Sequence, residues 1–278
     1  MYSIYHFFKD LVVQKEQFGE STKLKNFPFD SNLFSCENVG QFPDLAIKLN
    51  KSSDLFTGGE LIELKDSDTY TVSSFNSTIP TGKKDIAKII KSDNSIVKQQ
   101  MEKAGDDIFS LPVRDVYYLV RGKNKKKSVQ KIALIHGSFF ETIQSKELIS
   151  QSFSQVLNER LTESGLTITP EMKHLLTTIF SEQENFSKVR TVDKASVKLR
   201  FRVMTEVKAE GNILNTTKYP EILDNTLNFV LPYHTEEDRT IALQKMATVF
   251  SKQELATFKE IKLKHHFNGY FLVFQVSL

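Results

Sequence analysis

The stretch that decides the fold is Phe42–Lys65, which reads FPDLAIKLNKSSDLFTGGELIELK. At each end of it, every second residue is apolar, which is typical of a β-strand. The middle, residues 50–59, is rich in turn-forming residues and ends in a Gly-Gly pair, so we expect an antiparallel hairpin. If the two ends of this middle segment pair with each other, Asp44 lies opposite Lys65 and beside Glu63.

This hairpin would bring two carboxylates and an ammonium group together. Cross-strand neighbours on one face of a sheet lie roughly 5 Å apart. Hard cations such as Mg²⁺ prefer carboxylate oxygens and keep several waters, which leaves room for a phosphate. The metal lowers the pKa of a bound water and polarises the phosphoryl group. Lys65 can orient that water and offset the charge that develops in the transition state. The sequence therefore predicts a site for magnesium and a phosphodiester, with Asp44, Glu63 and Lys65 as catalytic residues.

The arrangement resembles that of the PD-(D/E)xK nuclease superfamily, and within it the chain looks most like a type II restriction endonuclease. Asp44 matches the aspartate of the PD pair, and Glu63 and Lys65 match the ExK triplet. The resemblance implies that Asp44 and Glu63 bind the metal together with the backbone carbonyl of Leu64. It covers the chain from the first helix through the strand near Val120, where the expected order of helix, three strands, helix and strand is that of the nuclease core.

Other residues compete for these roles. Asp54 is a second candidate for the first carboxylate, although the expected register places it in the turn. ExK triplets also begin at Glu171, Glu206 and Glu260. We expect the first of these at a helix start and the last at a helix end, whereas Glu206 lies on a strand-like run with Asp193 upstream but without a proline or a hairpin. A motif this short also arises by chance, so an ordinary solvated sheet face is the structural alternative.

Two stretches are candidates for DNA contacts. Residues 66–85 are dense in short hydroxyl and amide side chains, which donate to phosphate oxygens and base edges. A helix is expected to begin there at Thr81 or Gly82 with two lysines in its first turn, where a bound phosphate would resolve their conflict with the helix dipole. The second stretch is a strand over residues 197–207 with three cations on one face. The predicted DNA-binding residues are Ser73, Ser74, Asn76, Ser77, Thr78, Lys83, Lys84, Lys198, Arg200 and Arg202.

The predicted fold class is α/β with α+β elaborations, namely a restriction-endonuclease-like core in which helices flank a mixed central sheet. We expect this core in residues 1–144 and a C-terminal α+β extension for DNA recognition or dimerisation in residues 145–278, although the two can also form one continuous domain. Hydrophobic periodicity and turn residues predict the other elements. Helices are expected over residues 4–12, over 85–104 with a break near 93–94, over 145–186 as a pair, and from Ser251; strands are expected over 33–39, 115–121, 129–137 and 197–207, and on both sides of Asn268-Gly269.

Composition sets limits on the class of protein. The 278 residues are 40% hydrophobic and 26% charged, which is ordinary for a soluble globular protein. A net charge of +3 does not make the chain a polycation, so any binding of nucleic acid depends on how the charges are arranged. The single cysteine, Cys36, excludes an internal disulfide and a multi-cysteine zinc site, as in a reducing compartment. No apolar run approaches the length of a membrane span, so we expect a cytoplasmic protein that does not enter a membrane.

These features predict a type II restriction endonuclease that hydrolyses phosphodiester bonds at a specific sequence in double-stranded DNA and requires Mg²⁺. A palindromic target is matched by two-fold symmetry, so we expect a homodimer. The resemblance also implies a functional pairing with a cognate DNA methyltransferase. Two alternatives stay open: a PD-(D/E)xK nuclease of DNA repair or mobile elements, and a non-catalytic DNA-binding protein in which the motif is accidental. The recognition sequence, the cleavage position and the residues that read bases do not follow from the sequence.

Overall fold

The chain forms two compact units. The computed structural model describes residues 2–13, 30–37, 42–72, 80–90, 92–124, 126–141, 145–182, 185–192, 195–202 and 213–278. Unit 1 comprises Met1–Ser73, Pro80–Glu141 and Lys208–Leu278, and unit 2 comprises Ser74–Ile79 and Thr142–Val207. The predicted boundary between the nuclease core and the extension lies after residue 144. The chain leaves unit 1 close to that point but returns to it after residue 207.

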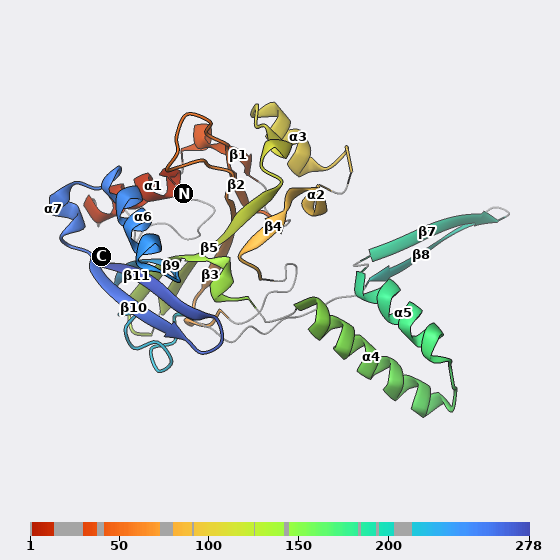
Figure 1. Cartoon of the computed structure of the whole chain (residues 1–278). Coiled ribbons are helices and arrows are strands. Elements are labelled where there is room, and N and C mark those ends of the chain that lie inside the picture. The colour runs from red at the N-terminus through yellow and green to blue at the C-terminus, as the bar shows by residue number, and fades with distance from the viewer. Residues whose placement is uncertain are drawn as a thin grey trace. The chain divides into compact units, whose positions relative to one another are not determined.

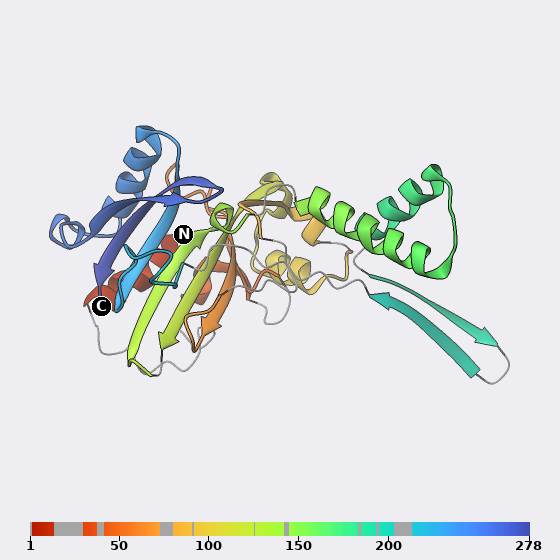
Figure 2. The ribbon, with the colours of Figure 1, turned by 90° about the horizontal axis from the view of Figure 1, so that it is seen from below.

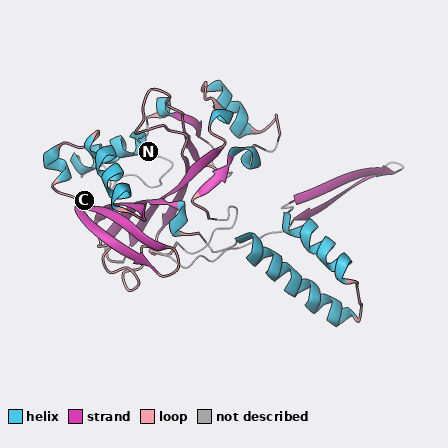
Figure 3. Ribbon diagram, viewed as in Figure 1, coloured by secondary structure: helices cyan, strands magenta, loops and turns pink. Residues whose placement is uncertain are grey.

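Unit 1 is built on a mixed nine-stranded sheet flanked by helices, which makes the fold α/β as predicted (Figures 1 and 3). Its strands are β1 (Phe34–Glu37), β2 (Leu45–Ile47), β3 (Leu61–Ser67), β4 (Lys83–Asp85), β5 (Val113–Asn124), β6 (Val129–His136), β9 (Thr226–Tyr233), β10 (Lys259–His265) and β11 (Gly269–Ser277). Its helices are α1 (Tyr2–Val13), α2 (Ile86–Ile89), α3 (Ile96–Lys103), α6 (Glu236–Ala247) and α7 (Lys252–Leu255), with short 3₁₀ turns at Ser31–Leu33, Ile108–Ser110 and Gly137–Phe139. The strand order is β1-β2-β3-β5-β6-β9-β11-β10, and β4 pairs with β5 beside this path. The β3–β5 and β6–β9 pairs are parallel, and the other pairs of this sheet are antiparallel.

The core of unit 1 lies between one face of the sheet and helices α1 and α6. Ile4, Phe7 and Phe8 of α1 are buried, as the amphipathic pattern predicted. The rings of Tyr5 and Phe8 pack against Phe229 of β9, and in Figure 2 α1 passes behind the strands of the sheet. The same core contains residues of β3 and β5, so this packing fixes the strands that carry the candidate site.

The connection from β3 to β5 contains β4, α2 and α3, because two parallel neighbours need a crossover between them. The expectation of a helix that begins at Thr81 or Gly82 is wrong. Residues Lys83–Asp85 form β4, which is hydrogen-bonded to the first residues of β5, and the helix begins at Ile86 with Asp85 as its N-cap. Both lysines therefore lie on a strand and not in the first turn of a helix. The expected break in this helical segment is confirmed, because α2 and α3 are separate helices.

The last third of the chain extends the same sheet. β9 pairs with β6, and the β10–β11 hairpin continues the sheet beyond it. The hairpin turns at Asn268 and Gly269 as predicted, and Gly269 has a φ of +80°. A helix does begin after Ser251, but α7 ends at Leu255. Glu260 therefore lies on β10, which pairs with β11 along its whole length, and not at a helix end as expected.

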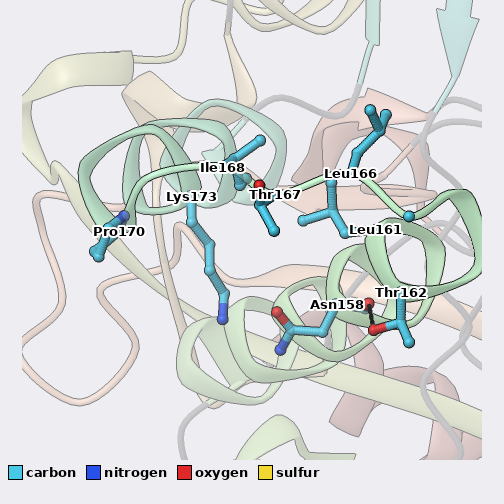
Figure 4. Close-up of a pocket in the computed structure, with 9 residues that line it drawn as sticks. Asn158, Leu161, Thr162, Leu166, Thr167, Ile168, Pro170 and Lys173 are labelled. Atoms are coloured by element: carbon cyan, nitrogen blue, oxygen red, sulfur yellow. Dashed lines mark hydrogen bonds between the residues drawn. The ribbon is translucent and has the colours of Figure 1, made fainter.

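Unit 2 consists of a helix pair and a two-stranded sheet. Its elements are α4 (Ser145–Ser164), α5 (Pro170–Glu182), β7 (Asn185–Val192) and β8 (Ala195–Arg202). The helix pair agrees with the prediction up to Glu182, but Asn185 and Phe186, which were expected to be helical, begin β7, a strand that was not predicted. β8 begins two residues before the strand that was expected there. Among the side chains described between Ser150 and Ile179, Thr177 is the only one that is buried. A surface pocket lies where α4 turns into α5 (Figure 4); Lys173 is its single charged lining residue, so it lacks the grouped charges of a catalytic site.

Candidate active site

The predicted hairpin is formed by β2 and β3, which pair antiparallel. Leu45 lies opposite Ile62, and the same register places Asp44 opposite Glu63. The sequence analysis had placed Asp44 opposite Lys65, so the expected register is wrong by two residues. A shift of two keeps every side chain on its own face of the sheet. The carboxylate of Asp44 therefore stays close to that of Glu63, and its charge acts on the pKa of Glu63.

A close approach of the backbone explains the shift. The amide of Asn50 donates to the carbonyl of Thr57 at 2.7 Å, and this pair closes the hairpin. Gly58 and Gly59 lie beyond it in the returning chain, with φ values of +70° and +85°. A Cβ on Gly58 would lie 2.0 Å from the carbonyl oxygen of Lys48. Glycine is therefore needed at these two positions because the backbone is left-handed and, at Gly58, packs closely against the backbone of Lys48. The pair is not the turn of the hairpin.

Glu63 is the most buried charged group of the site. It follows two apolar residues of β3 and is only 6% exposed. Lys65, two residues further on the same face, donates from Nζ to Oε1 of Glu63 at 2.7 Å. The other carboxylate oxygen, Oε2, is buried and has no hydrogen-bond partner among the described residues. A buried polar atom without a partner is costly, and a bound cation would satisfy it.

Asp44 and the backbone of Leu64 face each other. The amide of Leu64 donates to Oδ2 of Asp44 at 2.8 Å. In a hydrogen-bonded pair of antiparallel strands, the N–H and C=O groups of one residue point to the same side, so the Leu64 carbonyl also points towards the end of β2. β2 begins only at Leu45, and Pro43 has no N–H that could bond this carbonyl. The PD pair thus leaves two carboxylates and a carbonyl as oxygen ligands in one place.

The charges around Asp44 and Glu63 favour the binding of a cation. Burial raises the pKa of Glu63, and the nearby charge of Asp44 raises it further, while Lys65 and Lys84 oppose both effects. The pKa of Glu63 stays above its usual value on balance. Two neighbouring carboxylates resist simultaneous ionisation unless positive charge is close to them. A divalent metal would supply that charge, and oxygen ligands of this kind suit Mg²⁺.

The two lysines of β4 serve opposite faces of the sheet. Lys84 lies on the face of the site, where its Nζ is 4.6 Å from the centre of the Phe42 ring and its charge lowers the pKa of Glu63. Lys83 points to the other face, where its Nζ is 3.9 Å from the carboxylate of Asp115. Both had been predicted to bind DNA from a helix terminus. Only Lys84 joins the site, and it does so from a strand.

Tyr118 is a site residue that the sequence analysis missed. It lies next to Glu63 in the parallel pairing of β3 with β5, and its side chain is buried. Burial raises the pKa of the Tyr118 hydroxyl, and the charge of Glu63 raises it further. The alternating pattern of β5 identifies a strand, but the register of two parallel strands joined by a long crossover leaves no local signal in the sequence.

The remaining predicted DNA-binding residues lie either outside the described residues or in unit 2. The polar residues of the first stretch, Ser73, Ser74, Asn76, Ser77 and Thr78, lie outside the described residues. Lys198, Arg200 and Arg202 lie on β8 of unit 2. Within the described residues of unit 1, the predicted catalytic and metal-binding residues are therefore joined by one predicted DNA contact, Lys84.

The competing carboxylates lack this setting. Asp54 is exposed in the connection between β2 and β3, so Asp44 is the carboxylate that faces Glu63. Glu171 lies in the first turn of α5, as expected. Glu260 lies on a strand but forms an ion pair with Arg239, with an N–O distance of 2.6 Å. Residues 193 and 206, the remaining pair, lie outside the described part of the chain.

Within the described residues, no three His, Cys, Asp or Glu side chains are grouped to hold a metal ion. The set at β2 and β3 is of another kind, with two carboxylates and one backbone carbonyl. No family model, curated protein or solved structure matched the chain when these were searched. In the part of the chain that the structure describes, no helix is both long and apolar enough to cross a membrane.

Proposed function

We propose that this protein is a magnesium-dependent endonuclease of the PD-(D/E)xK type, acting as a type II restriction endonuclease on double-stranded DNA. One observation carries the proposal: Asp44, Glu63 and Lys65 converge on one face of a β-hairpin, and a buried oxygen of Glu63 has no hydrogen-bond partner among the described residues. Metal coordination accounts for that oxygen, whereas a solvated sheet face does not.

Each residue has a defined role in the proposal. Asp44, Glu63 and the carbonyl of Leu64 hold the metal. When bound, Mg²⁺ supplies a water of lowered pKa and a Lewis acid for the phosphoryl oxygen. Lys65, oriented by its hydrogen bond to Glu63, donates to the attacking water and offsets the negative charge that grows on the phosphorus-bound oxygens. Lys84 adds a second positive charge on the same face.

The order of elements around the site supports the same assignment. A helix precedes three antiparallel strands, and a partly helical crossover leads to β5, parallel to β3. This is the order of elements that the resemblance to the nuclease superfamily implies. Fold alone does not determine function, so the weight of the proposal rests on the hairpin residues.

The proposal extends to partners. A palindromic DNA target would call for a homodimer. Val156, Leu166, Met172 and Leu175 of the α4–α5 segment are more than half exposed, and exposed apolar side chains of this kind suit a second copy of the chain. We also propose a cytoplasmic location and a cognate DNA methyltransferase as the functional partner. Sedimentation of the purified protein with and without duplex DNA tests the dimer, and a strictly monomeric protein in both conditions would contradict it.

The decisive experiment is cleavage of a phage genome of known sequence with Mg²⁺ and, separately, with EDTA. We expect discrete bands with Mg²⁺ and intact DNA with EDTA. The control is the Asp44→Asn variant, which removes one metal ligand with almost no change in volume and should leave the DNA intact. A smear would contradict sequence specificity, and intact DNA at every protein and metal concentration would contradict the nuclease assignment.

A further inference from the structure

The β7–β8 ribbon of unit 2 concentrates the positive charge of the chain. Residues 185–202 contain six lysines and arginines and a single acidic residue, Asp193. This segment thus has five more positive than negative charges, whereas the whole chain has only three more. The remainder of the protein is therefore net negative. A strong one-sign charge on a short segment predicts an anionic partner for that segment.

Strand pairing sorts these charges onto two different faces. Val189 pairs with Lys198, Ser187 with Arg200, and Asn185 with Arg202. Directly paired residues share a face, and residues two apart along a strand share it as well. One face of the ribbon, here called the basic face, therefore holds Lys198, Arg200 and Arg202 together with their partners on β7, of which two are polar and one is valine.

The opposite face has a different composition. It holds Phe186 paired with Phe201, and Leu199 and Val197 paired with Lys188 and Arg190. Both of its cations pair with apolar residues, whereas on the basic face Arg200 and Arg202 pair with a serine and an asparagine. Hydroxyl and amide side chains donate to phosphates and to base edges, so the basic face has the composition of a DNA-binding surface.

The dimensions also suit duplex DNA. The major groove admits a two-stranded β-ribbon. Successive cations of the basic face lie roughly 6.8 Å apart along their strand, which corresponds to about two nucleotides of rise in duplex DNA. Arginine in particular matches the geometry of phosphate oxygens.

We propose that the β7–β8 ribbon is a DNA-binding arm that places its basic face in a groove of double-stranded DNA. Lys198, Arg200 and Arg202 contact backbone phosphates, and Asn185 and Ser187 lie where they can reach phosphates or base edges. This inference rests on the proposed function only for the choice of DNA as the polyanion, and it requires no cleavage.

Two double variants of the full-length protein separate the faces. Lys198→Ala with Arg200→Ala removes one lysine and one arginine from the basic face, and Lys188→Ala with Arg190→Ala removes the same charges from the opposite face. The binding of a labelled DNA duplex is measured by fluorescence anisotropy in EDTA over a series of salt concentrations. Circular dichroism and thermal melting confirm that both variants are folded.

We expect the basic-face variant to bind at least severalfold more weakly than the wild type, and the slope of log K against log salt to fall by about 1.8, since each phosphate contact contributes about 0.9. The opposite-face variant should keep the wild-type slope. Equal losses in both variants would mean that only net charge matters and would overturn the inference. Loss of binding to anionic vesicles or RNA, with duplex DNA binding unchanged, would overturn it as well.

The same measurements distinguish this inference from the nuclease proposal. A protein that binds duplex DNA through the basic face but never cleaves it would support the ribbon and refute the nuclease. If the protein cleaves DNA but the basic-face variant binds DNA like the wild type, the result would support the nuclease proposal and refute the role of the ribbon.

Discussion

Two antiparallel strand pairs of this protein, β2–β3 and β7–β8, differ in the sign and setting of their charged residues. β2–β3 lies within a nine-stranded sheet, and its charges are of both signs and partly buried. β7–β8 is a two-stranded sheet whose charges are almost all positive. The comparison teaches that the first pair is suited to chemistry, because a reaction needs groups held in a fixed geometry. The second pair is suited to binding, because a row of cations on one face of a ribbon can contact successive backbone phosphates.

The largest effect is expected from the carboxylates of β2–β3. Glu63→Gln or Asp44→Asn should reduce the rate of DNA cleavage by about 10³-fold or more, since loss of a single charge-stabilising group in an active site already costs about 10²–10³. DNA affinity should stay within a few-fold of the wild type, because in the proposed mechanism these residues bind the metal and not the duplex. Cleavage rates on a linear DNA and anisotropy in EDTA measure the two quantities. Full activity in either variant would end the assignment of β2–β3 as the active site.

Lys65 should come next. Lys65→Ala removes the group that we propose orients the water, and we expect the cleavage rate at saturating DNA to fall by about 10²-fold with little change in affinity. Lys65→Arg should restore only part of the rate, because a guanidinium does not replace a compact ammonium in position or shape. Single-turnover kinetics separate these outcomes from binding. A variant that lost affinity but kept its rate would place Lys65 among the binding residues instead.

The neighbouring lysines of β4 give a matched test of the two faces of the sheet. Lys84→Ala should lower the cleavage rate by about tenfold, since Lys84 adds positive charge near Glu63. Lys83→Ala removes the same charge from the adjacent residue but on the other face, so its rate should match that of the wild type. Rates of both variants are measured at one metal concentration. Equal losses of cleavage rate in the two variants would show that the face on which a lysine lies does not affect catalysis.

The smallest effect concerns stability on that other face. Burial raises the pKa of Asp115, but hydrogen bonding and charge from His136, with Lys83 and Lys245, outweigh it and hold the pKa below its usual value of 3.8. A depressed carboxyl pKa stabilises the fold above the unfolded-state pKa, and this contribution disappears as the pH falls through the folded-state pKa. Asp115→Asn should therefore lower the melting temperature slightly at neutral pH and have no effect well below pH 3.8. Melting curves across this range test the sign, and a loss that persists in strong acid would contradict it.

Much of the framework could be predicted because strands and turns leave local patterns. The β2–β3 hairpin and the face shared by Glu63 and Lys65 follow from alternation alone. The exact pairing of the strands did not follow. A Gly-Gly pair such as Gly58-Gly59 can occur in a turn or at a close backbone contact, and the sequence does not distinguish the two. A register depends on a hydrogen-bond pattern that the sequence does not display.

The features that were missed depend on contacts between distant segments. β4 is three residues long and exists because it pairs with the start of β5. Tyr118 reaches Glu63 through a parallel register set by a long crossover. The strands after residue 225 join the first part of the chain in one sheet, which no local pattern indicates. Local propensity identifies elements, and tertiary pairing decides which residues meet.

The most direct test of the site is a titration of the metal-free protein with Mg²⁺ or Mn²⁺, followed by thermal melting without DNA. A ligand that binds only the folded state stabilises it by about 2.7 kcal/mol at a hundred times its Kd. We predict that the wild type gains melting temperature with metal and that Asp44→Asn and Glu63→Gln do not. If all three proteins respond to the metal equally, the carboxylates of β2–β3 do not form a metal site, and the account of this hairpin as the active site is contradicted.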